Sequence, residues 1–175
     1  MGDLMQALSI GLSTARYRIR TGDELGVRSV GFVASKIKGF PARIPIGMLS
    51  THVVALKKDN AGARDLQDVF DIGFSLAKRI NRIPLARGMQ FGYAVMPLIV
   101  GNAPDVEALW YAANAPRAHW ALFEFPVIVD IAMEKVTFFE GFRARGAIVW
   151  PILQELVISH IEPVVDEELR RGSPR

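Results

Sequence analysis

The stretch HWALFEFPVIVDIAMEKVTFFEG (residues 119–141) decides the fold, because it predicts a strand, a turn and a second strand in direct succession. Along the first strand, at 120–130, side chains alternate between the faces of a sheet, so Glu124 and Asp130 share one face. The two carboxylates stand about 20 Å apart at the usual rise per residue, too far to act as one acid and base pair. Asp130 is predicted to open the turn, because an Asp side chain bonds the backbone that follows it.

The rest of the chain alternates between apolar residues at helical spacing and runs rich in β-branched residues. The clearest helix has acids in its first turns and bases in its last, as the helix dipole favours. The predicted helices are 2–19, 63–82, 102–114 and 146–161, and the predicted strands are 27–39, 44–58, 89–101, 120–130 and 136–141.

This order, αββαβαββα, predicts an α/β fold with a mixed five-stranded sheet flanked by helices. Two strand–helix–strand units favour parallel pairing, and the last two strands favour an antiparallel hairpin. The alternative is an α+β fold with a mainly antiparallel sheet. We expect a single domain over residues 1–162 and a frayed tail over 163–175.

Composition narrows the classes of protein that the chain can belong to. Half of its 175 residues are hydrophobic, yet the longest apolar runs are shorter than the roughly 18 residues that a membrane span needs. The absence of cysteine excludes disulfides and thiol catalysis. The first residues lack the charge order of an export signal, so we expect a cytoplasmic protein without a membrane span.

Charge is distributed unevenly along the chain. Residues 1–101 carry 14 Lys and Arg against 7 Asp and Glu, whereas residues 102–175 carry 7 against 11. An anionic partner or ligand could bind the first half, and so could the acidic half of another copy. The basic residues could also hold a nucleic-acid backbone or, alternatively, protect strand edges from aggregation; they are Arg16, Arg18, Arg20, Arg28, Lys36, Lys38, Arg43, Lys57 and Lys58.

Glu124 is the main candidate for a catalytic residue. A carboxylate within an apolar strand costs several kcal/mol if it is ionised and unpaired. It therefore faces water, pairs with a cation such as Arg117 or Arg143, or has a raised pKa that would mark a functional site. A site of this kind would place Arg117, His119 or Arg143 beside Glu124 in a concave pocket as ligand-binding residues.

Asn102 is a second candidate for ligand binding. It can cap the helix that follows a central strand, and helix starts at strand ends attract anions. Asp105 argues against a ligand there, because its charge already occupies the helix start.

We expect no metal site and no cofactor, since the three histidines lie on separate elements and the usual nucleotide and hydrolase motifs are absent. A lone histidine in a strand, such as His52, is typical of a hydrogen-bonded core or edge residue.

These patterns favour a non-enzymatic module that acts through self-association or through binding a protein or ligand. Exposed aromatic anchors are typical of interfaces, and the aromatic residues late in the chain are Phe138, Phe139, Phe142 and Trp150. The alternative is a hydrolase-type enzyme acting on a small molecule, with Glu124 as general base or metal ligand and an arginine as anion clamp. A weak nucleic-acid binder is the third hypothesis.

Overall fold

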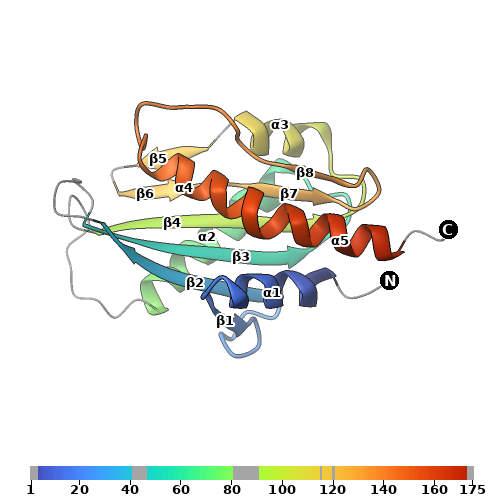
Figure 1. Ribbon diagram of the computed structural model, residues 1–175, viewed down its shortest axis with the longest axis horizontal. Helices are drawn as coiled ribbons and strands as arrows, with labels where there is room; N and C mark the ends of the chain where they lie inside the picture. Colours follow the sequence, from blue (N-terminus) through green and yellow to red (C-terminus); the bar gives the residue numbers. More distant parts are fainter. Residues whose placement is uncertain (1–3, 41–46, 81–90, 115, 120, 173–175) are drawn as a thin grey trace.

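The structure is a computed structural model that describes residues 4–40, 47–80, 91–114, 116–119 and 121–172 (Figure 1). Its helices are α1 (Leu4–Thr14), α2 (Ala63–Ile80), α3 (Val106–Asn114), α4 (Val149–Leu156), the π-helical turn η1 (Val157–Ile161) and α5 (Glu162–Gly172). Its strands are β1 (Arg18–Thr21), β2 (Phe32–Gly39), β3 (Met48–Lys57), β4 (Phe91–Gly101), β5 (Arg117–His119), β6 (Leu122–Glu124), β7 (Val127–Asp130) and β8 (Lys135–Thr137).

The described part of the chain forms one mixed sheet of eight strands in the order β1-β2-β3-β4-β6-β5. The long strand β4 pairs with β6 along its first half and with β7 along its second, and β8 pairs with β7. Strands β1, β2 and β3 are antiparallel, whereas β3, β6 and β7 all run parallel to β4. The predicted α/β class, the parallel pairing around β4 and the final hairpin are therefore confirmed.

The sheet has more strands than the five predicted, for local reasons. Pro126 has no backbone N–H, so the predicted strand at 120–130 divides into β6 and β7. Helix α1 ends at Thr14, and Arg16 adopts a positive φ of 65° that reverses the chain into β1. A short strand, β5, also forms where a linker was expected.

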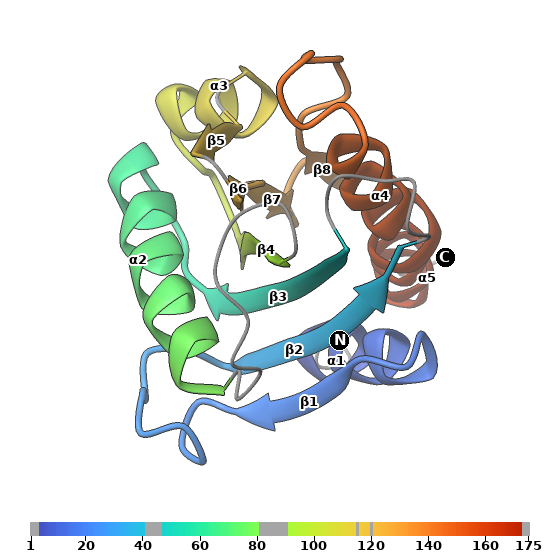
Figure 2. The ribbon, with the colours of Figure 1, turned by 90° about the vertical axis from the view of Figure 1, so that its left-hand side faces the viewer.

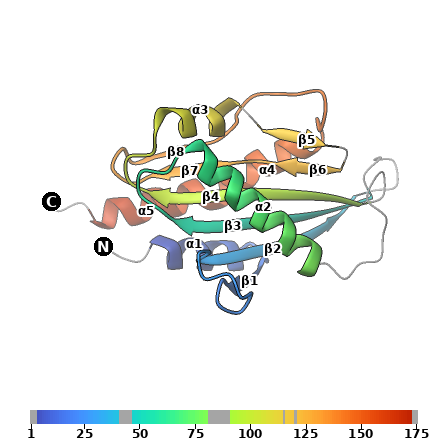
Figure 3. The ribbon, with the colours of Figure 1, turned by 180° about the vertical axis from the view of Figure 1, so that it is seen from behind.

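Helices cover both faces of the sheet. Helices α2 and α3 lie on one face, and α1 with the α4–α5 rod lies on the other (Figure 2). Seen from behind, α2 crosses β3 and β4 (Figure 3). Gly73 permits this close approach, because a Cβ at that position would lie 2.7 Å from methyl carbons of Val54 and Val95.

The core consists of two main apolar clusters, one under each helical layer. The larger lies beneath α1 and α4–α5 and centres on Trp150, whose ring packs edge-on against Phe123 with centroids 5.5 Å apart. Phe123, Phe125 and Val127 all belong to this cluster, as the predicted alternation requires. The indole N–H of Trp150 donates to the carbonyl of Arg145 at 2.7 Å, so this large side chain is also fixed in orientation.

The last helix continues beyond its predicted end. Pro151 lies in the first turn of α4, where a missing N–H does no harm. Pro163 would interrupt an α-helix, and just before it the N–H of Glu162 donates to the carbonyl of Val157, five residues back. This wider turn, η1, carries the chain into α5, so residues 163–172, which were expected to fray, are helical.

Among the described helices, none combines the length and the apolar character that a bilayer span requires.

Candidate functional site

Glu124, the main candidate from the sequence, lies inside the sheet on the face covered by α2 and α3. Strand β6 places it between Val95 of β4 and Arg117 of β5, which are its direct register partners. Only 3% of the residue is exposed. Glu124 is therefore a buried carboxylate that needs partners.

Those partners come from α3 and β5. The phenol of Tyr111 donates to Oε1 of Glu124 at 2.6 Å, and Nε of Arg117 lies 3.9 Å from Oε2. The half-exposed guanidinium of Arg117 also lies over the Tyr111 ring, 5.3 Å from its centroid. Arg117, one of the two cations named from the sequence as partners for this carboxylate, thus lies at ion-pair distance from it. Tyr111 is a partner that the strand pattern alone could not identify.

The electrostatics of the cluster follow from its burial. Burial raises the pKa of Glu124; the Tyr111 hydrogen bond and the positive charge of Arg117 oppose that rise, and the negative charge of Asp71 on α2 adds to it. Burial, followed by the adjacent Glu124, raises the pKa of Tyr111. The carboxyl oxygens face a phenol and a guanidinium of the same chain, an arrangement that stabilises a fold without a substrate.

Arg143, another predicted ligand-binding residue, has partners other than Glu124 among the described residues. Arg143 donates to the carbonyl of Pro116 at 3.2 Å and to that of Asn114, and it lies over the Phe139 ring, so it clamps a loop to the end of α3. The side chain of His119 lies outside the described residues. The four prominent hollows on the described part of the surface have linings that do not include Glu124.

Asn102 has a structural role different from the predicted one. Its backbone N–H and its side-chain amide both donate to Oδ1 of Asp59, at 2.7 and 2.9 Å. The prediction that Asn102 caps the helix is wrong: α3 begins at Val106, and the cap is Asp105, whose Oδ1 accepts from the N–H of Ala108 at 2.6 Å. The Asp105 charge thus occupies the helix start, as the sequence indicated.

A second polar network lies on the same face, around His52. Nδ1 of His52 lies 2.9 Å from the hydroxyl of Ser35, and Nε2 lies 2.8 Å from that of Ser50. The ring stacks on Tyr93, with centroids 6.3 Å apart. Burial lowers the pKa of His52 to about 4, so the imidazole is neutral at physiological pH. His52 is a hydrogen-bonded core residue, as predicted.

The two networks lie in one transverse row of the sheet. Strand register aligns Arg18, Ser35, His52, Val95, Glu124 and Arg117 across β1, β2, β3, β4, β6 and β5. The apolar member, Val95, lies directly beneath Gly73 of α2. Helix α2 therefore packs on the sheet between two closed polar networks.

Basic residues of the first half do not share one face. Arg18 and Arg20 pair with alternate residues of β2 that face α2, whereas Lys36 and Lys38 occupy the positions between and face the α4 side. Lys58 forms an ion pair with Asp65 at 2.6 Å. Arg43 lies outside the described residues. The basic side chains of β1 and β2 are therefore divided between the two faces of the sheet, whereas the nucleic-acid hypothesis requires them on one face.

Three of the four late aromatic residues are core residues. Phe138, Phe139 and Trp150 are buried, so they cannot serve as the interface anchors that were expected, whereas Phe142 is 74% exposed. Two further exposed apolar residues lie on α3: Val106 is 82% exposed, and Trp110, one turn later, is 60% exposed. We call Val106, Trp110 and Phe142 the α3 surface. Arg143 ties the Phe142 loop to the last residue of α3.

No protein-family model matches the chain, and no curated protein sequence matches it. Within the described residues, no group of three or more His, Asp or Glu side chains could hold a metal ion.

Proposed function

We propose that this chain is a non-enzymatic cytoplasmic module that acts by pairing with a second copy of itself through the α3 surface. The observation that carries the proposal is the exposure of Trp110, at 60%, one helical turn from Val106. Tryptophan is among the residues most enriched in the side chains that dominate interface energies. The lack of cysteine supports the cytoplasmic location.

Charge at the two ends of α3 favours a second copy over an unrelated partner. Glu107 lies in the first turn of the helix, and Arg143 is bonded at its last residue. In a two-fold arrangement with antiparallel α3 helices, Glu107 of each copy lies near Arg143 of the other, while the two Trp110 rings meet near the axis. Opposite charges at the two ends of α3 are what such an arrangement requires.

Light scattering during gel filtration tests this proposal at tens of micromolar protein. The wild type is expected to elute as a dimer, and both Trp110→Ser and Phe142→Ser are expected to elute as monomers with unchanged circular dichroism. Ile158→Ser is the matched control, because Ile158 is comparably exposed but lies on the opposite helical layer. A monomeric wild type, or a Trp110→Ser variant that still dimerises, contradicts the proposal.

The hydrolase-type alternative is favoured by one observation, the raised pKa of Glu124. The geometry supports it less well than association, because the carboxylate is covered by Tyr111 and Arg117 and the prominent hollows lie elsewhere. If Glu124 were a general base, Glu124→Gln would abolish turnover in a screen of ester and phosphoester substrates while leaving the fold intact. The separation of the basic residues likewise weakens the nucleic-acid hypothesis.

A further inference from the structure

A groove of about 380 Å³ lies on the face opposite Glu124, between the α4–η1 helix and strands β2 and β3. One wall is apolar and consists of Pro151, Ile152 and Leu156. Its volume is near the lower end of the range for small-ligand sites, which are mostly apolar with a few convergent polar groups.

Thr51 is a buried polar residue that lines this groove. The residue is only 5% exposed, and its hydroxyl forms no hydrogen bond to any described residue. Neighbouring Ser50 and His52 face the other side of β3 and are fully bonded. Among the described residues, no buried side-chain oxygen or nitrogen lacks a hydrogen-bond partner, so the Thr51 hydroxyl is not an unsatisfied buried group. As a lining residue, Thr51 is placed to bond a polar group that enters the groove.

Positive charge surrounds Thr51. Lys36 is its register partner on β2, and Lys38 follows on the same face. The ammonium of Lys36 donates to the carbonyl of Ala15 at 2.8 Å and lies over the Tyr17 ring, whereas Lys38 forms no ion pair with a described residue. Lys36 is therefore held in place by the fold, and Lys38 is available to bind an anion.

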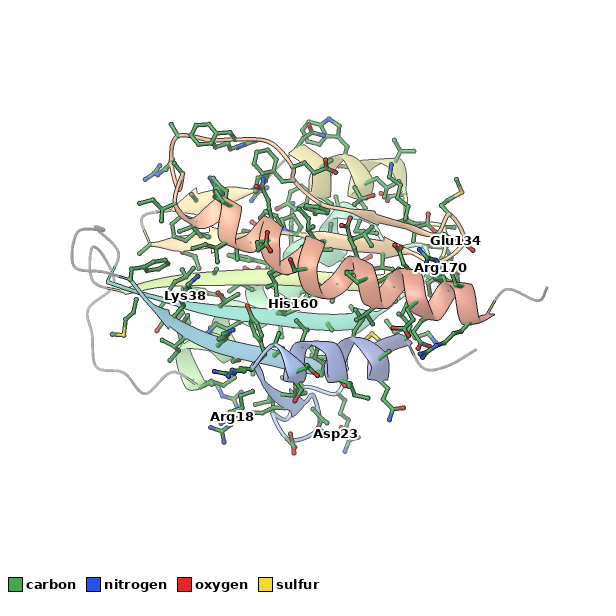
Figure 4. All side chains as sticks on the ribbon, in the orientation of Figure 1. Arg18, Asp23, Lys38, Glu134, His160 and Arg170 are labelled. Carbon is green, nitrogen blue, oxygen red and sulfur yellow. The ribbon has the colours of Figure 1, made fainter. Side chains whose placement is uncertain are left out.

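The π-helical turn η1 brings a third polar group to the rim. His160 belongs to η1 and lines the groove, and α1 packs closely behind it, since a Cβ on Gly11 would lie 3.6 Å from the carbonyl oxygen of His160. Single π-helical turns occur frequently at functional sites because they redirect side chains. Figure 4 shows His160 and Lys38 on the same face of the molecule.

One carboxylate limits the kind of anion that fits. Glu155 lines the groove and accepts a hydrogen bond from the hydroxyl of Ser159. Its charge opposes a ligand that carries two negative charges in a small volume, such as phosphate, more strongly than it opposes a single carboxylate. The apolar wall, in turn, favours a ligand with a hydrocarbon body.

We propose that this groove binds a small organic acid, with its carboxylate on Lys38 and the Thr51 hydroxyl and its short apolar body along Ile152 and Leu156. Tyr17, whose pKa burial raises to about 12, remains a neutral phenol and contributes a donor at the groove wall. The site lies on the opposite face of the sheet from α3, so it is independent of the dimer proposed above.

Isothermal titration calorimetry with hexanoate as the probe tests the site. Wild-type protein is expected to bind hexanoate with a dissociation constant of about 1 mM or below. Hexanamide has the same shape without the charge, and it should bind at least about tenfold more weakly, because a hydrogen bond to a charged group contributes about a tenfold change in affinity or more. Lys38→Met and Thr51→Val should each weaken hexanoate binding by about tenfold and about fivefold, respectively. Lys78→Met, on the α2 face, is the matched control.

Three results would overturn the proposal: no hexanoate binding by the wild type, equal affinity for hexanoate and hexanamide, or tighter binding of inorganic phosphate than of hexanoate. Because Lys38 is exposed, Lys38→Met is expected to fold normally, and thermal unfolding checks both variants. Undiminished binding by both folded variants would also overturn it.

Discussion

Buried polar residues on the two faces of the sheet differ in their hydrogen bonding. On the α2 and α3 face, His52 and Glu124 lie beneath helices, and each is bonded to partners of the same chain. On the α1 and α4 face, Thr51 is nearly as buried, yet its hydroxyl is open to a groove lined by Lys38 and His160. Thr51 and His52 are adjacent in one strand, yet His52 is bonded within the chain and Thr51 lines a groove.

This difference shows why burial alone does not identify a functional residue. A buried polar group with a full set of internal partners contributes to a specific fold, and removing a partner costs stability. A polar group that lines a groove and bonds no described residue adds no internal hydrogen bond with that part of the chain, and it is available to a ligand. The comparison therefore predicts large stability effects on the α2 face and small ones in the groove.

The largest effect is expected from acid, through His52. Because burial lowers the pKa of His52 from 6.5 to about 4, the unfolded chain binds more protons than the folded one between these values, and stability falls as the pH decreases. The free energy of unfolding should drop by about 3 kcal/mol from pH 7 to pH 4. Urea unfolding at several pH values in this range measures the free energy of unfolding. In the His52→Leu variant, this free energy should change less with pH. If the free energy of unfolding of the variant falls with pH as steeply as that of the wild type, His52 is not the cause of the acid dependence.

Glu124 should act in the opposite sense over the same acid range. Its pKa is raised in the folded state, so its protonation on acidification favours folding and offsets part of the loss caused by His52. The Glu124→Gln variant should therefore lose stability more steeply with acid than the wild type. A shallower loss would show that the carboxyl titrates normally.

The next largest effect concerns the contact of α2 with the sheet between the two networks. Gly73→Val should destabilise the protein by about 2.5 kcal/mol, because the new side chain collides with Val54 and Val95 and lifts the helix. Ser75→Val, at an exposed position of the same helix, is the control and should change stability by less than about 0.5 kcal/mol. Thermal unfolding of the two variants decides whether α2 packs as closely as described.

A smaller effect is expected from the Glu124 network. Glu124→Leu should cost about 2 kcal/mol, because it leaves the buried phenol of Tyr111 without an acceptor while Arg117 can still reach water. Tyr111→Phe should cost about 1 kcal/mol, since the carboxylate keeps Arg117. Urea unfolding near neutral pH measures both. A stable Glu124→Leu protein would show that the pairing is not structural.

The smallest effect separates the neighbours Ser50 and Thr51. Ser50→Ala should cost about 1 kcal/mol by removing a partner of His52. Thr51→Val should change stability by less than about 0.5 kcal/mol, because no hydrogen bond to a described residue is lost. Equal losses in the two variants would mean that the Thr51 hydroxyl has an internal partner.

Periodicity predicted the α/β class and the parallel strands around β4, because apolar patterns report which faces are buried. It could not predict β5 or the division at Pro126, since three-residue strands leave no periodic signal. The sequence named Arg117 and Arg143 as candidate cations for Glu124, because a buried carboxylate needs a partner. It could not identify Tyr111, which a helix brings to the carboxylate. The groove depends on register between β2 and β3 and on η1, and neither is encoded in a local pattern.

Amide chemical-shift mapping during a hexanoate titration tests the contrast between the two faces most directly. The account predicts that shifts gather at Lys36, Lys38 and Thr51 and along residues 151–160, while the amides of Tyr111 and Glu124 stay unchanged. Shifts that gather around Tyr111 and Glu124 instead would show that the network described as closed is the site that binds ligand.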